Sequence, residues 1–484
     1  MNLGISDKSF RGKKEASTKR VLSERLVVQI DSSLWIPESF KVSPDSRHVA
    51  YVAAAGRKRF VVLLDGKEGE QYDGIVKDSL IFSPDGTRMA YIAKVDKKWV
   101  VVVHGREEKQ YDGIVKDSLI FSPDGRRVAY VAAAGRKRFV VIDGKEEKQY
   151  DGVIAGTLIF SPDSKRVAYV ARVGKKWFVV VDGTEEKKYD GIGTYSLIFS
   201  PDGERVAYLA AVGKKQFVVV NGREQKQYDN IGAGRLIFSP DGKRLAYVAR
   251  VSKKWFVVVD GKEGKQYDGI LAGTPNFSHD SKRVAYVAEA GKKFFIVVDG
   301  KEGKHYDGIG AESLIFSPDS KEVIYAAAKD EKLFIVVDGK EEKQYDYKGA
   351  GSLIFSPDSK RVAYATSVGK KWSIVIDGRE GKPYDSIAAG SPIFSPDSKR
   401  VAYATAVGKK RCVVVDGKEE KPYDKIWSGS LMFSSDSKRV GYAAKGGEKW
   451  SVVVDGKEGK QYDDIVAIGG GRIIFDSPDS LHYL

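Results

Sequence analysis

The sequence predicts an all-β fold, a β-propeller built from four-stranded blades, and three observations support this prediction. The aspartate of the motif FSPDG, or of a close variant, recurs along the chain, and consecutive ones such as Asp85 and Asp124 lie 39 residues apart. Each repeat contains four short runs bounded by turn residues, and the first three are rich in Val, Ile, Leu, Phe and Tyr. Helical periodicity of useful length is absent from the sequence.

The repeat occurs in eleven full copies. The first interval is 40 residues because VVLLDG carries an extra leucine, and the following intervals are 39. A fixed period of this size is typical of units that cannot bury their faces alone and therefore stack against their neighbours. Counted by this aspartate, repeats 1 to 11 contain Asp45, Asp85, Asp124, Asp163, Asp202, Asp241, Asp280, Asp319, Asp358, Asp397 and Asp436.

Residues 235–270 show how each strand of a repeat is expected to form. The first strand, RLIF, ends at the turn SPDGK, in which proline fixes φ and aspartate bonds its own backbone. The second strand, RLAYVA, leads through RVSKK into the third, WFVVV. Asp-Gly after the third strand fits a type I′ hairpin because glycine accepts positive φ. The expected fourth strand, KEGKQYDGI, is the most polar of the four.

The two chain ends are expected to complete a closing blade within a propeller domain of residues 21–484. Residues 471–484 would supply its first two strands and residues 21–38 its third and fourth, which hides edge strands. Residues 1–20 are expected to form a disordered basic tail. The unbroken 39-residue spacing favours twelve blades in one ring. Two rings of about six blades are the alternative, because propellers typically have about 4–8 blades.

The motifs FSPDG and RVAY resemble the WD-like, PD-type repeats of the TolB-type β-propeller family. The resemblance covers roughly residues 39–484 and implies a propeller fold without implying an activity. The chain departs from TolB proteins because it shows no recognisable secretory leader and no separate N-terminal domain. Prolyl-oligopeptidase-type enzymes carry similar blades, but the sequence contains no G-x-S-x-G nucleophile motif.

Composition narrows the class of protein. The net charge of +15 suits an anionic partner, although it does not identify one. The one cysteine, Cys412, excludes an internal disulfide and is expected to be a small core residue. No stretch approaches 18 apolar residues, so no membrane-spanning helix is expected. The N-terminal residues lack the apolar run of a secretory signal, so we expect a cytoplasmic protein, and a monomer.

Candidate ligand-binding residues lie where the second strand of a repeat turns into the third. Other repeats hold arginine or glutamine at the tryptophan position, which indicates an accessible rim. Cations beside aromatic rings suit single-stranded nucleic acid or another anionic polymer. The alternative is that the lysines form solvated turns and the tryptophans pack between blades. The candidates are Lys97, Lys98, Trp99, Lys175, Lys176, Trp177, Lys253, Lys254, Trp255, Lys370, Lys371 and Trp372.

The loops between the fourth strand of one repeat and the first strand of the next vary most. Tyr195 and Trp427 are their bulky exceptions and are added as candidates at the mouth of a central channel. Small Gly-Ala loops at the same place are equally explained as plain connections.

No catalytic residue, metal site or cofactor site is predicted. Tyr-Asp recurs in every copy, but one aspartate per blade does not converge on a point, whereas calcium needs about six to eight oxygen ligands. A structural role is therefore expected for this pair and for the FSPDG aspartate. His48 and His482 share one repeat position and would lie on neighbouring blades. Two histidines do not complete a ligand set.

The sequence therefore predicts a non-catalytic binding scaffold that engages a protein or an anionic polymer through many weak contacts. The alternative is an enzyme, or a glycan-binding module, with its site in the central channel. Near-identical repeats count against catalysis because a catalytic site needs one asymmetric set of groups.

Overall fold

The computed structural model describes residues 2–9, 21–29, 34–56, 58–232, 236–310, 313–346, 351–463, 473–477 and 480–483. They form an all-β repeat of antiparallel sheets, as the sequence predicts. The short 3-10 helices η1 (Pro37–Ser39) and η2 (Ala155–Thr157) lie between strands. Unit 1 of the chain comprises Met1–Leu236, Val466–Ile474 and Leu481–Leu484, and unit 2 comprises Ile237–Ile465 and Phe475–Ser480.

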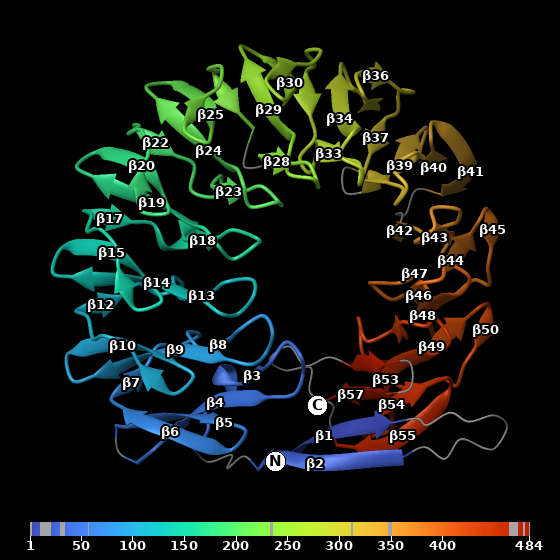
Figure 1. Ribbon diagram of the computed structural model, residues 1–484. Helices are drawn as coiled ribbons and strands as arrows, with labels where there is room; N and C mark the ends of the chain where they lie inside the picture. The colour runs from blue at the N-terminus through green and yellow to red at the C-terminus, as the bar shows by residue number, and fades with distance from the viewer. Residues whose placement is uncertain are drawn as a thin grey trace. The chain divides into compact units, whose positions relative to one another are not determined.

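Unit 1 contains the sheets of repeats 1 to 5 (Figure 1). The strands of this unit from β3 to β27 are β3 (Lys41–Val42), β4 (Val49–Ala54), β5 (Phe60–Leu64), β6 (Lys67–Tyr72), β7 (Gly74–Ile75), β8 (Ile81–Phe82), β9 (Met89–Val95), β10 (Lys98–Val103), β11 (Arg106–Glu107), β12 (Gly113–Ile114), β13 (Ile120–Phe121), β14 (Val128–Ala134), β15 (Lys137–Ile142), β16 (Lys145–Glu146), β17 (Gly152–Val153), β18 (Ile159–Phe160), β19 (Val167–Val173), β20 (Lys176–Val181), β21 (Thr184–Glu185), β22 (Gly191–Ile192), β23 (Ile198–Phe199), β24 (Val206–Val212), β25 (Lys215–Val220), β26 (Arg223–Glu224) and β27 (Asn230–Ile231).

Unit 2 contains repeats 6 to 11 from β28 onward. Its strands are β28 (Ile237–Phe238), β29 (Leu245–Val251), β30 (Lys254–Val259), β31 (Lys262–Glu263), β32 (Gly269–Ile270), β33 (Asn276–Phe277), β34 (Val284–Ala290), β35 (Lys293–Val298), β36 (Lys301–Glu302), β37 (Gly308–Ile309), β38 (Ile315–Phe316), β39 (Val323–Lys329), β40 (Lys332–Val337), β41 (Lys340–Asp346), β42 (Gly351–Phe355), β43 (Val362–Val368), β44 (Lys371–Ile376), β45 (Arg379–Glu380), β46 (Ser386–Ile387), β47 (Ile393–Phe394), β48 (Val401–Val407), β49 (Lys410–Val415), β50 (Lys418–Glu419), β51 (Lys425–Ile426), β52 (Met432–Phe433), β53 (Val440–Gly446), β54 (Lys449–Val454), β55 (Lys457–Tyr462) and β56 (Ile474–Ser477).

Repeat 4 shows the sheet in its common form. Its strands are ordered β17-β19-β20-β21, and β18 pairs with β19 beside β17. Strands β20 and β21 are joined by the two-residue loop Asp182-Gly183, whose φ angles are 50° and 77°. Positive φ at both positions is the type I′ turn that the Asp-Gly motif predicts.

The expected fourth strand divides between two sheets. In residues 262–270, β31 pairs with β30 of repeat 6, whereas β32 pairs with β34 of repeat 7. The backbone N–H of Asp268 donates to the carbonyl of Glu289 at 2.9 Å, which directs the chain onto the next sheet. One run of sequence therefore ends one sheet and begins another, so the prediction of a single fourth strand is wrong.

Apolar side chains fill the space between consecutive sheets. Tyr150 and Val140 of repeat 3 belong to the same buried cluster as Tyr169 and Phe178 of repeat 4. The ring of Tyr150 meets the edges of the other two aromatic rings at centroid distances of 6.4 and 5.4 Å. Within a unit, each sheet thus completes its core with the next one, as expected for a repeat too small to bury its own faces.

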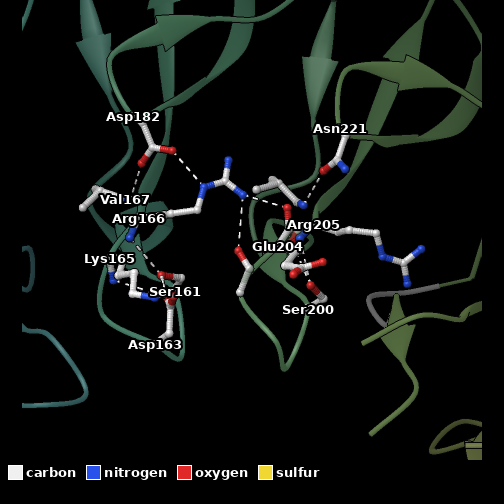
Figure 2. A network of polar contacts seen from close by, with 12 residues as sticks. Ser161, Asp163, Lys165, Arg166, Val167, Asp182, Ser200, Glu204, Arg205 and Asn221 are labelled. Atoms are coloured by element: carbon white, nitrogen blue, oxygen red, sulfur yellow. Dashed lines mark hydrogen bonds and ion pairs between the residues drawn. The ribbon is translucent and has the colours of Figure 1, made fainter. Parts of the chain in front are cut away.

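An arginine joins one sheet to the turn of the next, and Figure 2 shows this contact for Arg166 of repeat 4. Its Nε lies 2.8 Å from Oδ2 of Asp182 in its own sheet. Its Nη1 donates to the carbonyls of Gly203 and Glu204 in repeat 5 at 3.2 and 2.8 Å. The guanidinium lies 5.4 Å from the ring centroid of Phe199. The same hydrogen bonds are made by Arg127, Arg244, Arg283, Arg361 and Arg400.

The N-terminal segment differs from the expectation made for it. Asn2–Ser9 form strand β1 and pair antiparallel with β2 (Val21–Gln29), so this part of residues 1–20 is not a disordered tail. Residues 10–20 lie outside the described part of the chain. The physical reason is pairing: β1 lies between β2 and the C-terminal strand β57 (Ser480–Tyr483) in one sheet, where its backbone groups are bonded on both sides.

Residues 21–38 do not all belong to this end sheet. Trp35 forms a bridge with Ala53, and the N–H of Ile36 donates to the carbonyl of Val52 at 2.9 Å. These contacts assign residues 35–36 to the sheet of repeat 1. The boundary expected for the closing blade at residue 38 is therefore wrong. Residues 35–36 pair with strand β4 and so belong to the sheet of repeat 1.

The C-terminal strand β57 reaches the turn of repeat 1. Nε2 of His482 lies 2.6 Å from the carbonyl oxygen of Asp45. His482 occupies the position that Arg166 holds in repeat 4, and so does His48 in repeat 1, whose Nδ1 lies 2.7 Å from Oδ2 of Asp65. Like the arginine of other repeats, His482 thus contacts a backbone carbonyl in the turn that follows it in the sheet order, here in repeat 1, although the carbonyl lies one residue earlier in the turn.

Candidate functional site

The hairpin face consists, within each unit, of the turns between second and third strands and of the Tyr-Asp segments. Nζ of Lys176 lies 2.6 Å from Oδ1 of Asp190. The other oxygen of Asp190 accepts a hydrogen bond from the backbone N–H of Gly213, in the hairpin of the next repeat, at 2.8 Å. The hydrogen bond from Lys176 and that from Gly213 hold the pKa of Asp190 below its usual range. The Tyr-Asp aspartate therefore joins consecutive hairpins.

This arrangement supports the structural role expected for the Tyr-Asp aspartate, but its partners are a lysine of its own repeat and the hairpin of the next repeat, not its own turn. The same lysine–aspartate pair is formed by Lys98–Asp112, Lys137–Asp151, Lys215–Asp229, Lys254–Asp268, Lys293–Asp307, Lys371–Asp385, Lys410–Asp424 and Lys449–Asp463.

The candidate lysines fall into two groups. Lys98, Lys176, Lys254 and Lys371 are the paired lysines just described. Lys97, Lys175, Lys253 and Lys370 occupy the second position of two-residue hairpin loops and are exposed. None of this second group forms an ion pair within the described ranges. Only the second group offers uncompensated charge to a ligand.

The candidate tryptophans are half-buried rather than free at a rim. Trp177 packs against the cluster that contains Tyr189 and Phe217. Its ring also lies 5.4 Å from the guanidinium carbon of Arg172, its partner on the neighbouring strand. The core and the cation together restrict access to the ring, so Trp177 is a poor platform for stacking a base or a sugar.

The other candidate tryptophans lie in the same position. Lys94 covers the ring of Trp99 at 5.7 Å and Arg250 covers that of Trp255 at 5.2 Å. Trp372 pairs with Ser367 and packs against a buried cluster of repeats 9 and 10.

Tyr195 and Trp427 lie in different units of the chain and have different exposures. Tyr195 lies in unit 1 between β22 and β23, and 84% of its surface is exposed. Trp427 lies in unit 2 and is half-buried. Its backbone N–H donates to the carbonyl of Ala443 at 3.0 Å, and its carbonyl accepts from Oγ of Ser430 at 2.7 Å. Of the two side chains, only that of Tyr195 projects fully into solvent.

Sequence reasoning missed a set of half-buried glutamates on the opposite side of the sheets. Oε2 of Glu186 accepts a hydrogen bond from the hydroxyl of Tyr208 in the next repeat at 2.5 Å. Glu108–Tyr130 and Glu420–Tyr442 repeat the contact at 2.7 and 2.6 Å. Burial raises the pKa of these three carboxyls. The only signal in the sequence is that this position varies: it holds glutamate or glycine in ten repeats and Gln225 in repeat 5.

Metal and thiol chemistry find little support. Among the residues that the structure describes, no three His, Cys, Asp or Glu side chains are grouped so as to hold a metal ion. Cys412 is buried, as expected, and burial raises the pKa of its thiol to about 11. That thiol is protonated at neutral pH and is therefore a weak nucleophile. No helix in the described part of the chain has the length and apolarity needed to cross a membrane.

Comparisons with known proteins give a structural likeness only. No family model matches the chain, and no curated protein matches it. Among solved structures, 341 chains are similar to it. One is described as a crystal structure of the eukaryotic initiation factor; it is 16% identical, covers 72% of this chain and 96% of its own, and has a TM-score of 0.36. At these values the likeness carries no argument about function.

Proposed function

We propose that the repeated sheets are the blades of a β-propeller and that the protein is a non-catalytic scaffold that binds an anionic polymer through its hairpin tips. Three observations support a closed propeller: the regular 39-residue period, the packing of neighbouring sheets within a unit, and the contact between His482 and the turn of repeat 1 at Asp45. The sequence motifs are similar to those of TolB-type propellers.

Uncompensated charge at the hairpin tips carries the proposal. Several other cations of a repeat have carboxylate partners: Arg166 has Asp182, Lys176 has Asp190, and Lys148 pairs with Glu185 of the next repeat at 2.6 Å. The tip cations are exposed and form no ion pair in the parts of the chain described. They are Lys97, Arg136, Lys175 and Lys214 in unit 1, and Lys253, Lys292, Lys370 and Lys409 in unit 2.

The regular spacing of the tip cations suits a polymeric ligand that carries a negative charge on each of its units. Consecutive hairpins are joined by the Tyr-Asp aspartates, so the tip cations of neighbouring repeats are held on a common, ordered framework. Weak contacts with several phosphates or sulfates then sum to a useful affinity. The covered tryptophan rings favour charge over stacking as the source of binding.

The test compares two variants with the same reduction in charge. In the first, Lys97, Arg136, Lys175 and Lys214 are replaced by serine. In the control, four exposed cations that follow the Asp-Gly or equivalent turns, Lys67, Arg106, Lys145 and Arg223, are replaced by serine. Affinity for a labelled single-stranded oligonucleotide and for heparin is measured at several salt concentrations.

We expect the slope of log affinity against log salt to fall by about 0.7 for each phosphate that the protein no longer neutralises, so by about 3 in the first variant. The control variant should keep nearly the wild-type slope. Equal reductions of slope in the two variants would show that only overall charge matters, and absence of binding by the wild-type protein to both ligands would reject the proposal.

A second prediction concerns the tryptophans. Replacement of Trp99, Trp177, Trp255 and Trp372 by alanine should lower the urea midpoint, because each half-buried ring contributes about 1–3 kcal/mol of packing. Oligonucleotide affinity should change little at a temperature where the variant is folded. A large drop in affinity at unchanged stability would instead identify the rings as the surface that touches the ligand.

A further inference from the structure

The repeat position that holds Glu108, Glu186 and Glu420 is glycine in other repeats, and its backbone makes the same hydrogen bond in both cases. The backbone N–H of Glu420 donates to the carbonyl of Val413 at 2.9 Å, and that of Gly381 donates to the carbonyl of Ile374 at 2.9 Å. The two residues are 39 apart and follow the same turn. Gly381 therefore lacks only the side chain that fills this place in the following repeat.

Gly381 lines a hollow of about 800 Å³ between repeats 9 and 10. A Cβ atom at Gly381 would lie 3.6 Å from the hydroxyl oxygen of Tyr403, which lines the hollow and is 4% exposed. Tyr403 is equivalent to Tyr442, whose hydroxyl donates to Glu420. Repeat 10 therefore has the equivalent tyrosine, Tyr403, but the residue beside its hydroxyl is Gly381, which has no carboxylate to accept a hydrogen bond.

The charge around the hollow favours an anion. Arg361 and Arg400 line it together with their ion-pair partners, Asp377 and Asp416. Two further cations, Arg379 and Lys399, line it too, with one further carboxylate, Glu380. The lining therefore carries four cations and three carboxylates, an excess of one positive charge. Arg379 and Lys399 are exposed and form no ion pair among the described residues.

We infer that the hollow at Gly381 is a binding site for a carboxylate on a short aliphatic stem, which takes the place of the glutamate side chain present in sister repeats. The Tyr403 hydroxyl donates a hydrogen bond to the ligand carboxylate, as Tyr442 does to Glu420. Arg379 and Lys399 attract the anion. The site lies among the Asp-Gly turns and does not depend on the hairpin-tip cations of the proposed function.

The glutamate repeats show that such a carboxylate is accommodated. Glu108, Glu186 and Glu420 each keep their hydrogen bond to tyrosine while half-buried between two sheets. The ligand carboxylate has two chemical sources, a free small acid or a glutamate side chain on another polypeptide. Both present the same terminal CH₂–COO⁻ group.

The experiment uses the full chain with 3-fluorotyrosine at position 403, whose ¹⁹F chemical shift reports on the hollow. Propionate has the length of the glutamate side chain, and propionamide is its neutral counterpart. Propionate should shift the signal in a saturable way and bind about ten-fold or more tightly than propionamide, as expected for a hydrogen bond to a charged acceptor. A Gly381→Glu chain should no longer show this titration.

A matched gain-of-site variant completes the test. Glu420→Gly, with 3-fluorotyrosine at position 442, opens the same hollow one repeat further on, and propionate should titrate that signal and restore part of the thermal stability that the substitution removes. The capped peptide acetyl-Gly-Glu-Gly-amide distinguishes the sources. Binding by propionate alone supports a free acid, and binding by both supports a polypeptide side chain as well. If neither shifts the signal at position 403, or if Gly381→Glu leaves the titration unchanged, the inference is wrong.

Discussion

Replacement of Tyr189 by alanine should lower the free energy of unfolding by about 3–5 kcal/mol, the range for removing a large aromatic side chain from a packed core. Tyr189 is fully buried between repeats 4 and 5, and its ring meets those of Tyr208 and Phe217 at centroid distances of 6.3 and 5.5 Å. Its removal leaves a cavity that neighbouring sheets cannot fill without distorting their pairing. Urea unfolding followed by circular dichroism measures the effect.

Tyr189→Phe is the matched control for this result. The hydroxyl of Tyr189 is buried and makes no hydrogen bond within the described ranges, so its removal should be neutral or stabilising by up to about 1 kcal/mol. Tyr208→Phe should instead destabilise, because the Tyr208 hydroxyl donates to Glu186. Equal effects of the two phenylalanine substitutions would contradict the hydrogen-bond assignment.

Acid should unfold the protein over a narrow range below about pH 4, because carboxyls that are hydrogen-bonded in the folded state become protonated there. In repeats 2, 3, 4, 6, 7, 9 and 10, two aspartates, such as Asp163 and Asp190 of repeat 4, have pKa values below the ordinary 3.8. Hydrogen bonds from the Ser161 hydroxyl and then from the Lys165 backbone cause the shift at Asp163, and similar bonds lower the pKa of Asp319 to about 2. A carboxyl with a depressed folded-state pKa stabilises the fold above its unfolded pKa, and this contribution disappears as the pH falls through the folded value.

The half-buried glutamates act in the opposite sense. The pKa values of Glu108, Glu186 and Glu420 are raised by burial, so their protonation favours the folded state as the pH falls through the normal glutamate range. The aspartates are more numerous, and we expect the urea midpoint to be steady between about pH 7 and 5 and then to fall steeply toward about pH 2. Asp163→Asn should make that fall slightly shallower. A midpoint that rises on acidification would contradict the assigned hydrogen bonds.

Local turn chemistry explains why the repeat and its strands could be predicted from sequence. Asp182-Gly183 needs two positive φ angles, and that requirement is met by few residue pairs. The division of residues 262–270 between two sheets could not be predicted in this way, because it depends on the partner strand β34, which the run itself does not encode. Strand β1 could not be predicted for the same reason: its polar sequence gains order only from pairing with β2 and β57.

The candidate site could be predicted only in part. The sequence places Lys175 and Lys176 side by side, but only the structure shows that Asp190 neutralises the second and leaves the first exposed. Because other repeats have arginine or glutamine at the tryptophan position, the sequence predicts an open rim. In the structure, Trp177 instead lies between the core and the guanidinium of Arg172. Lys176 and Asp190 are 14 residues apart. Trp177 is covered both by Arg172 across its own hairpin and by the cluster that contains Phe217 of the next repeat, so the Lys-Lys-Trp motif alone does not predict these contacts.

The arginine contacts have a consequence for how the gene could change length. Each joins residues at a constant separation: Arg88 reaches the carbonyls of Gly125 and Arg126, and Arg166 reaches those of Gly203 and Glu204. Excision of residues 127–165 would splice Arg126 directly to Arg166 and leave both sets of partners intact. Insertion or deletion of whole 39-residue repeats can therefore leave every junction matched, whereas a deletion that is not a multiple of 39 residues separates an arginine from the carbonyls that it contacts.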